Sequence, residues 1–167
     1  MPALSAGSNV AQSVQYSKTV FGIAQPLPLN FPSPDFGASN FAWGAGSGAK
    51  QYNNCTEAAS VGVAYGTPLV LDLTSCPDPA GATVTFADVV AIWLSCPSTN
   101  TNPIAVGAGT DPVAWLTNAI TMYPGMGYVM VYPVVTGLAI TASTACKVTF
   151  TAQTSGTQNI SYVFLGH

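Results

Sequence analysis

Between residues 51 and 167, proline and glycine interrupt the chain every few residues, and the apolar runs between them show no convincing helical periodicity. Val, Ile, Thr and aromatic residues, which favour extended backbone, dominate these runs. The expected strands cover residues 61–65, 68–73, 83–86, 89–94, 104–109, 119–123, 128–132, 138–142, 146–152 and 158–166. Short strands separated by turn residues predict an all-β protein with a single β-sandwich over residues 51–167, most simply jelly-roll-like.

Three local patterns refine this prediction. The run from Val89 to Leu94 is continuously apolar, which indicates a strand buried on both faces. Pro124-Gly125 lies between two apolar runs and predicts a tight turn. Residues 111–116 fit either a turn or a single helical turn.

Residues 1–50 differ from the rest and predict an extended N-terminal arm. Four prolines between residues 26 and 34 alternate with apolar residues and leave few backbone donors for a sheet. A glycine-rich stretch studded with aromatic residues follows, and aromatic side chains bury much area at low entropic cost. The arm therefore either lies along a neighbouring protein or folds back onto its own domain. Its candidate contact residues are Leu27, Leu29, Phe31, Phe36, Phe41 and Trp43.

Charged residues make up only 5% of the chain, against about 25% in a typical soluble domain. They are Lys18, Lys50, Lys147, Asp35, Glu57, Asp72, Asp78, Asp88 and Asp111, with one histidine, His167, and no arginine. We expect no enzyme, because acid–base catalysis needs positioned titrating groups and these are scattered singly. We expect no nucleic-acid binding, because the net charge of −3 repels phosphates.

A surface so poor in charge tends to associate with other surfaces. This favours a protein that works inside an assembled particle, filament or cell-surface layer. Residues 112–146 contain no charged residue, yet prolines and glycines break this stretch, so we expect no membrane span. Residues 1–7 lack the features of a secretory signal, so we expect assembly in the cytoplasm.

The four cysteines leave two alternatives open. Cys55, Cys76, Cys96 and Cys146 could form two disulfides in any of three connectivities, or remain four buried thiols. No C-x-x-C pair or internal histidine completes a zinc site, so we expect no metal and no cofactor. Several aspartates fall near turns, where capping of the turn is a commoner role than binding calcium.

Several short motifs follow one another in order between residues 61 and 167. They are Leu71-Asp72-Leu73-Thr74, the run from Val89 to Leu94, Val106-Gly107-Ala108-Gly109 followed by Asp111-Pro112, Pro124-Gly125, Thr141-Ala142-Ser143-Thr144-Ala145, Val148-Thr149-Phe150, and the stretch from Tyr162 to Gly166. This order resembles that of structural proteins of tailed-bacteriophage virions. The four cysteines and the long N-terminal arm depart from that pattern.

The resemblance implies a small virion protein, often trimeric, that decorates the capsid as a cement protein or forms a head or tail appendage. Its partners would be the major capsid protein or other virion proteins, and its location the virion, assembled in the host cytoplasm. One alternative is a glycan- or receptor-binding head-fibre or tail module. Its aromatic platforms would come from Trp93, Trp115, Tyr123, Tyr128 and Tyr132. The other alternative is a cell-surface or filament subunit.

Overall fold

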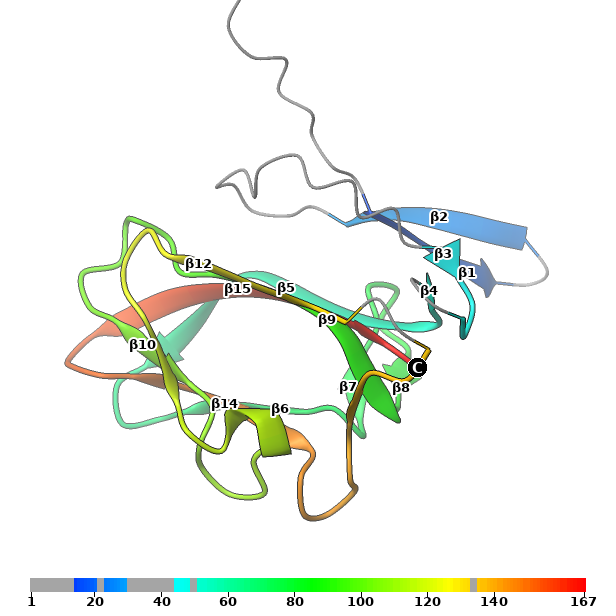
Figure 1. The fold of residues 1–167 in the computed structure, drawn as a ribbon. Coiled ribbons are helices and arrows are strands. Elements are labelled where there is room, and N and C mark those ends of the chain that lie inside the picture. The colour runs from blue at the N-terminus through cyan, green and yellow to red at the C-terminus, as the bar shows by residue number, and fades with distance from the viewer. Residues whose placement is uncertain (1–13, 21–22, 30–43, 49–50, 133–134) are drawn as a thin grey trace, which may run out of the picture.

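A computed structural model describes residues 14–20, 23–29, 44–48, 51–132 and 135–167. Apart from the 3-10 turn η1 (Ala114–Leu116), the elements of this described part are strands, which confirms the predicted all-β class. Two antiparallel sheets face one another and form a sandwich (Figure 1).

Sheet 1 is the upper layer in Figure 1, and sheet 2 is the lower layer. The strands of sheet 1, in spatial order, are β12 (Gly127–Val131), β9 (Asp88–Ser95), β15 (Thr157–Gly166) and β5 (Asn54–Ala64), with the short β13 (Leu138–Ala139) also paired to β9. Those of sheet 2 are β11 (Ile120–Met122), β10 (Ile104–Val106), β14 (Lys147–Ala152) and β6 (Leu69–Asp72). A small hairpin of β7 (Cys76–Pro77) and β8 (Thr83–Val84) lies in the β6–β9 connection.

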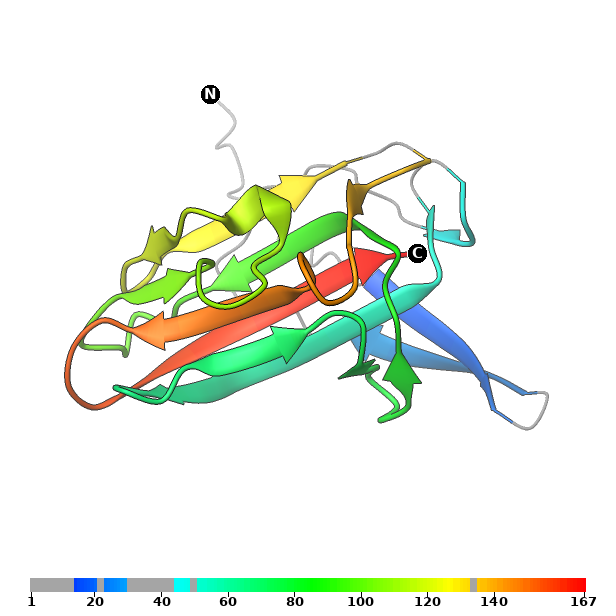
Figure 2. The same cartoon turned by 90° about the horizontal axis from the view of Figure 1, so that it is seen from below.

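The order of the strands is that of a jelly roll. If the main strands are numbered 1 to 8 along the chain, from β5 to β15 without β7, β8 and β13, sheet 1 reads 6-3-8-1 and sheet 2 reads 5-4-7-2. Successive strands thus alternate between the sheets, except for β10 and β11, which pair within sheet 2, and the order is that of two Greek keys. Figure 2, seen from below, shows the chain crossing between the layers at both ends of the sandwich.

The main core lies between the two sheets. Phe150 and Tyr162 stack across it with their ring centroids 5.4 Å apart, and Phe164 meets Tyr162 edge-on. The largest fully buried side chains around them are Phe86, Leu73, Ile92, Leu94, Ile104, Met122 and Ile160. Burial of these side chains supplies the main driving force for folding.

β9 is buried along its whole length, which confirms the prediction for residues 89–94. Its pairing with β15 shifts register between Leu165 and Gly166, so Val90 is an extra residue in the ladder. Beyond this bulge the faces alternate, with Ile92 and Leu94 in the main core and Trp93 in a second apolar cluster. Sheet 1 is therefore apolar on both faces near β9.

The N-terminal part contains two further strand pairs. β1 (Val14–Val20) and β2 (Ile23–Leu29) form an antiparallel hairpin, and β3 (Gly44–Ala45) pairs in parallel with β4 (Gln51–Tyr52). Pro26 and Pro28, which were expected to leave few backbone donors for a sheet, both lie in β2. A two-stranded hairpin has only edge strands, where proline is tolerated.

Candidate interaction surfaces

The charged residues of the sandwich are segregated at one of its ends. Asp72 ends β6, Asp88 begins β9 and Lys147 begins β14. Because the strands are antiparallel, these positions all lie at the end where β15 finishes. The four connections at the opposite end, residues 65–68, 96–103, 123–126 and 153–156, contain no charged residue. We call this opposite end the neutral tip.

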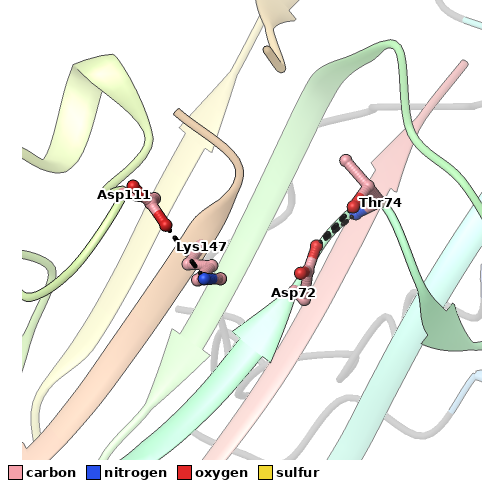
Figure 3. Close-up of polar contacts among 4 residues, drawn as sticks. All are labelled: Asp72, Thr74, Asp111 and Lys147. Atoms are coloured by element: carbon pink, nitrogen blue, oxygen red, sulfur yellow. Dashed lines mark hydrogen bonds and ion pairs between the residues drawn. The ribbon is translucent and has the colours of Figure 1, made fainter. Parts of the chain in front are cut away.

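Figure 3 shows two polar contacts at the charged end, one between Asp72 and Thr74 and one between Lys147 and Asp111. Asp72 Oδ1 accepts hydrogen bonds from the Thr74 hydroxyl at 2.6 Å and from the Thr74 backbone N–H at 2.9 Å. The hydroxyl bond is the main reason why the pKa of Asp72 lies below its ordinary value. Lys147 Nζ lies 3.0 Å from Asp111 Oδ2, and this bond raises the lysine pKa. Because both side chains are partly exposed, solvent screens this ion pair and its contribution to stability is small.

The motif around residues 106–112 has a structural role at this end. Gly107 and Gly109 have φ angles of 108° and 92°, and a Cβ on either would lie 2.7 Å from a neighbouring atom. Asp111 also has positive φ, and its carbonyl oxygen accepts hydrogen bonds from the backbone of Cys146 and Lys147. The glycines therefore let the β10–β11 connection pack against β14.

The other charged side chains at this end also have partners nearby. Asp78 is buried and accepts hydrogen bonds from the backbone N–H groups of Ala80 and Ala82, which is the capping role expected of it. His167 Nδ1 lies 3.0 Å from Asp88 Oδ1. In the described part of the chain, no group of three or more His, Cys, Asp or Glu side chains is arranged to hold a metal ion.

The neutral tip presents tyrosines among small polar residues. Tyr65 and Tyr123 are 60% and 62% exposed, on the loops next to the two edge strands of sheet 1. Serine, threonine, asparagine and glycine make up much of the remaining tip. Tyrosine with these small polar residues is the composition of protein surfaces that bind other molecules through loops.

Buried amides hold the tip loops in place. Gln158 is 2% exposed, and its Oε1 accepts hydrogen bonds from the backbone N–H groups of Thr101 and Asn102 at 3.0 and 3.1 Å. The Asn100 side chain joins the same loop to β15. The backbone N–H of Gly125 donates a hydrogen bond to the carbonyl oxygen of Cys96 at 2.8 Å, which joins the β11–β12 turn to this loop. The tip is thus prearranged, which lowers the entropic cost of binding.

The outer face of sheet 1 is a second candidate surface. We define it by the apolar cluster Tyr52, Cys55, Val90, Ala91, Trp93, Val163 and Leu165, with the partly buried Val129 packed against it. These residues lie on the side of the sheet away from sheet 2. Glu57, opposite Val163 in the ladder, has a pKa raised by burial. An outer face of this composition is costly to leave in water.

All four cysteines are free and buried. Burial raises the pKa of the Cys55 thiol well above its ordinary value and that of Cys76 to about 11. Cys96 also has a raised pKa because it is buried. These thiols behave as small apolar side chains of the interior, and the disulfide alternative stays a prediction.

The structure describes some of the predicted contact residues and not others. Leu27 and Leu29 lie in β2, whereas Phe31, Phe36, Phe41 and Trp43 lie outside the described residues. Of the five aromatics expected for a glycan platform, Trp93 is buried and Tyr123 and Tyr132 are exposed. Tyr65, which the sequence reasoning missed, is the other exposed tyrosine of the tip. The sequence analysis placed Tyr65 at the end of the expected strand 61–65, and the glycine that follows it was the available signal for a turn.

The comparisons with known proteins give no relative. No protein-family model, curated protein or solved structure matches the chain. In the described part of the chain, no helix has the length and apolarity needed to cross a bilayer. The function is therefore argued from the surfaces themselves.

Proposed function

We propose that the protein is a non-enzymatic structural protein of a tailed-phage virion. In this role it is a capsid decoration (cement) protein that binds the head through its neutral tip. The observation that carries the proposal is the tip itself, where exposed Tyr65 and Tyr123 stand on a charge-free surface braced by buried amides. The centres of protein–protein interfaces are depleted in charge and enriched in tyrosine.

The fold and the motif order support a place in a virion. Jelly rolls are common in viral capsid proteins but also occur in lectins and cupins, so the fold alone does not assign a function. Cupin-type metal chemistry would need a cluster of ligands. Among the described titratable side chains, Asp72 and Asp78 instead accept hydrogen bonds within turns. Asp111 forms a surface ion pair with Lys147.

The proposed partners are the major capsid protein or other virion proteins, and the proposed assembly is a homotrimer. A specific contact needs about 800 Å² per partner. The four loops of the neutral tip gather at one end of the sandwich, between the two edge strands of sheet 1 (Figure 2). Light scattering after gel filtration tests the trimer, and a stable monomer would contradict it.

Binding to heads tests the role of the tip. The full chain is mixed with purified heads that lack it, and binding is measured by cosedimentation. We expect Tyr65→Ser combined with Tyr123→Ser to weaken binding about tenfold or more. Val135→Ser is the matched control, because Val135 is 60% exposed but lies in the β12–β13 connection, at the end of the sandwich opposite the tip. No binding of the wild type, or equal binding of the tip variant and the control, would overturn the proposal.

The same tip supports a second candidate, a glycan-binding module of a head fibre or tail. Tyr123 and Tyr65 offer exposed rings, and the tip asparagines and threonines offer neutral donors and acceptors. Aromatic rings with such polar groups suit a sugar face. A glycan array with the full chain distinguishes the two candidates. Hits that are lost in the tyrosine variant favour the glycan module, and a blank array removes it.

A further inference from the structure

The distance between the charges and the neutral tip limits what the tip can bind. Asp88 begins the eight-residue β9, whose other end, Ser95, adjoins the tip. At about 3.3 Å per residue, Asp88 lies roughly 23 Å from the tip along the strand. Asp72 is nearer, because β6 has only four residues, but it still lies about 13 Å from Pro68 along the strand. At physiological ionic strength the Debye length is about 8 Å, so solvent largely screens both charges at the tip.

The other described charges also belong to the charged end. Lys147 is opposite Asp72 in the ladder, so these two charges of opposite sign partly cancel at a distance. Glu57 lies in the half of β5 near the charged end, opposite Val163. The β1–β2 hairpin, which contains Lys18, lies toward the charged end in both Figure 1 and Figure 2. The field of the described charges is therefore weak at the tip.

The groups that the tip presents to a partner are neutral. Tyr65 and Tyr123 lie on the loops next to the edge strands of sheet 1, and the loops of the central strands β9 and β15 lie between them. Ser98, Thr99 and Thr154 are exposed on these central loops. Their hydroxyl groups donate and accept hydrogen bonds but supply no counter-charge.

This arrangement selects among partner surfaces. A charged side chain of the partner that is buried against the tip loses its hydration and gains no ion pair, which is costly. A neutral polar group finds hydroxyl partners there, and an apolar group finds the tyrosine rings. Electrostatic complementarity therefore favours a partner surface that also lacks charge.

We propose that the neutral tip docks on a charge-free patch of the head protein, through ring contacts and neutral hydrogen bonds. The inference rests on the proposed head contact and adds the chemistry of the surface that accepts it. The charged end then faces away from the head. Because no described charge acts across the contact, attachment is nearly independent of ionic strength.

Substitution of Thr99, which is exposed on the loop after β9, tests the charge of the partner surface. Binding of Thr99→Glu, Thr99→Lys and Thr99→Gln to purified heads that lack the protein is measured by cosedimentation. Thr99→Gln is the matched control, because glutamine has the size of glutamate without its charge. We expect both charged variants to bind about tenfold or more weakly than Thr99→Gln, since a neutral patch desolvates a charge of either sign. Tighter binding by one charged variant, or equal binding by all three variants, would overturn the proposal.

The salt dependence of the wild-type protein is a second measurement and needs no variant. We expect its dissociation constant to change less than about threefold between about 50 mM and about 500 mM sodium chloride, because the contact contains no charge pair for salt to screen. Weakening of about tenfold or more at the higher concentration would indicate ion pairs across the contact and would refute the charge-free patch. No binding of the wild type at either concentration would instead contradict the head contact itself, and the inference with it.

Discussion

The side-chain amide of Asn100 pairs with the backbone of Asn159 as a neighbouring strand would. Its Nδ2 donates to the Asn159 carbonyl oxygen at 2.7 Å, and its Oδ1 accepts from the Asn159 N–H at 2.8 Å. The β9–β15 ladder ends at Ser95 and Ser161, so this pair continues it by one step from a loop. A backbone position that would otherwise be unpaired is thus satisfied.

Asn100→Ala should therefore destabilise the protein by about 2 kcal/mol, because it removes both bonds and leaves the partly buried N–H and carbonyl groups of Asn159 unpaired. Urea unfolding at neutral pH measures the change. Asn118→Ala is the control, since Asn118 is exposed in the β10–β11 connection and should change stability by less than about 0.5 kcal/mol. Equal stabilities for the two variants would show that the amide pair contributes nothing.

Alanine substitutions at two glycines with positive φ distinguish the cost of backbone strain from the cost of a steric clash. Gly107→Ala should cost more than about 2 kcal/mol, because the new Cβ would lie 2.7 Å from the Leu116 carbonyl oxygen in addition to the unfavourable φ. Gly66→Ala should cost only about 1 kcal/mol, because its φ is 78° but nothing lies within 4 Å. Thermal unfolding of both variants measures the difference. A larger loss for Gly66→Ala would contradict the described packing of the β10–β11 connection.

Asp72 predicts a pH dependence. Its folded pKa lies below the ordinary value of 3.8, so its bonds to Thr74 stabilise the fold above about pH 4, and this contribution is lost as the pH falls further. Asp72→Asn should lower stability by about 1 kcal/mol at pH 7 and by less at about pH 3. Urea unfolding at both pH values measures this. The exposed Ser75→Ala should show no such dependence, and a constant loss in Asp72→Asn would refute the assignment.

The state of the cysteines is also measurable. With four buried thiols and raised pKa values at Cys55, Cys76 and Cys96, the native protein should react slowly with Ellman's reagent at about pH 8. In denaturant without reductant it should release four equivalents of thiol. A sample reduced and then desalted is the control. Fewer equivalents in the untreated protein would show that disulfides are present.

The sandwich was predictable because turn residues and apolar runs report directly on strands. The turn at Pro124-Gly125 joins β11 to β12 as expected, and residues 114–116 form a helical turn, which was one of the two alternatives for residues 111–116. The start of β5 was not predicted, because residues 56–60 combine threonine, glutamate, alanine and serine without a strand pattern. β15 imposes strand structure there, with a bulge near Ser60, whose N–H donates to the Ser161 hydroxyl.

The candidate surfaces were less predictable than the fold. The neutral tip brings together loops that are far apart in sequence. Tyr65 and Tyr123 lie at the same end of the sandwich only because of the jelly-roll connections. The outer face of sheet 1 was easier to predict, because the continuous apolar run through Trp93 indicates a strand that is buried on both faces. What provides that cover depends on contacts between distant segments, which a pattern along one strand does not contain.

The place of β15 between β9 and β5 has a consequence for biosynthesis. β5 ends at residue 64 and its partner begins at residue 157, an interval of about 5–20 s on the ribosome. During that time the apolar β9 and β5 have emerged without the strand that joins them. The nascent chain therefore exposes open, aggregation-prone edges, and the yield of folded protein in a cell should depend on chaperones that shield them until β15 arrives.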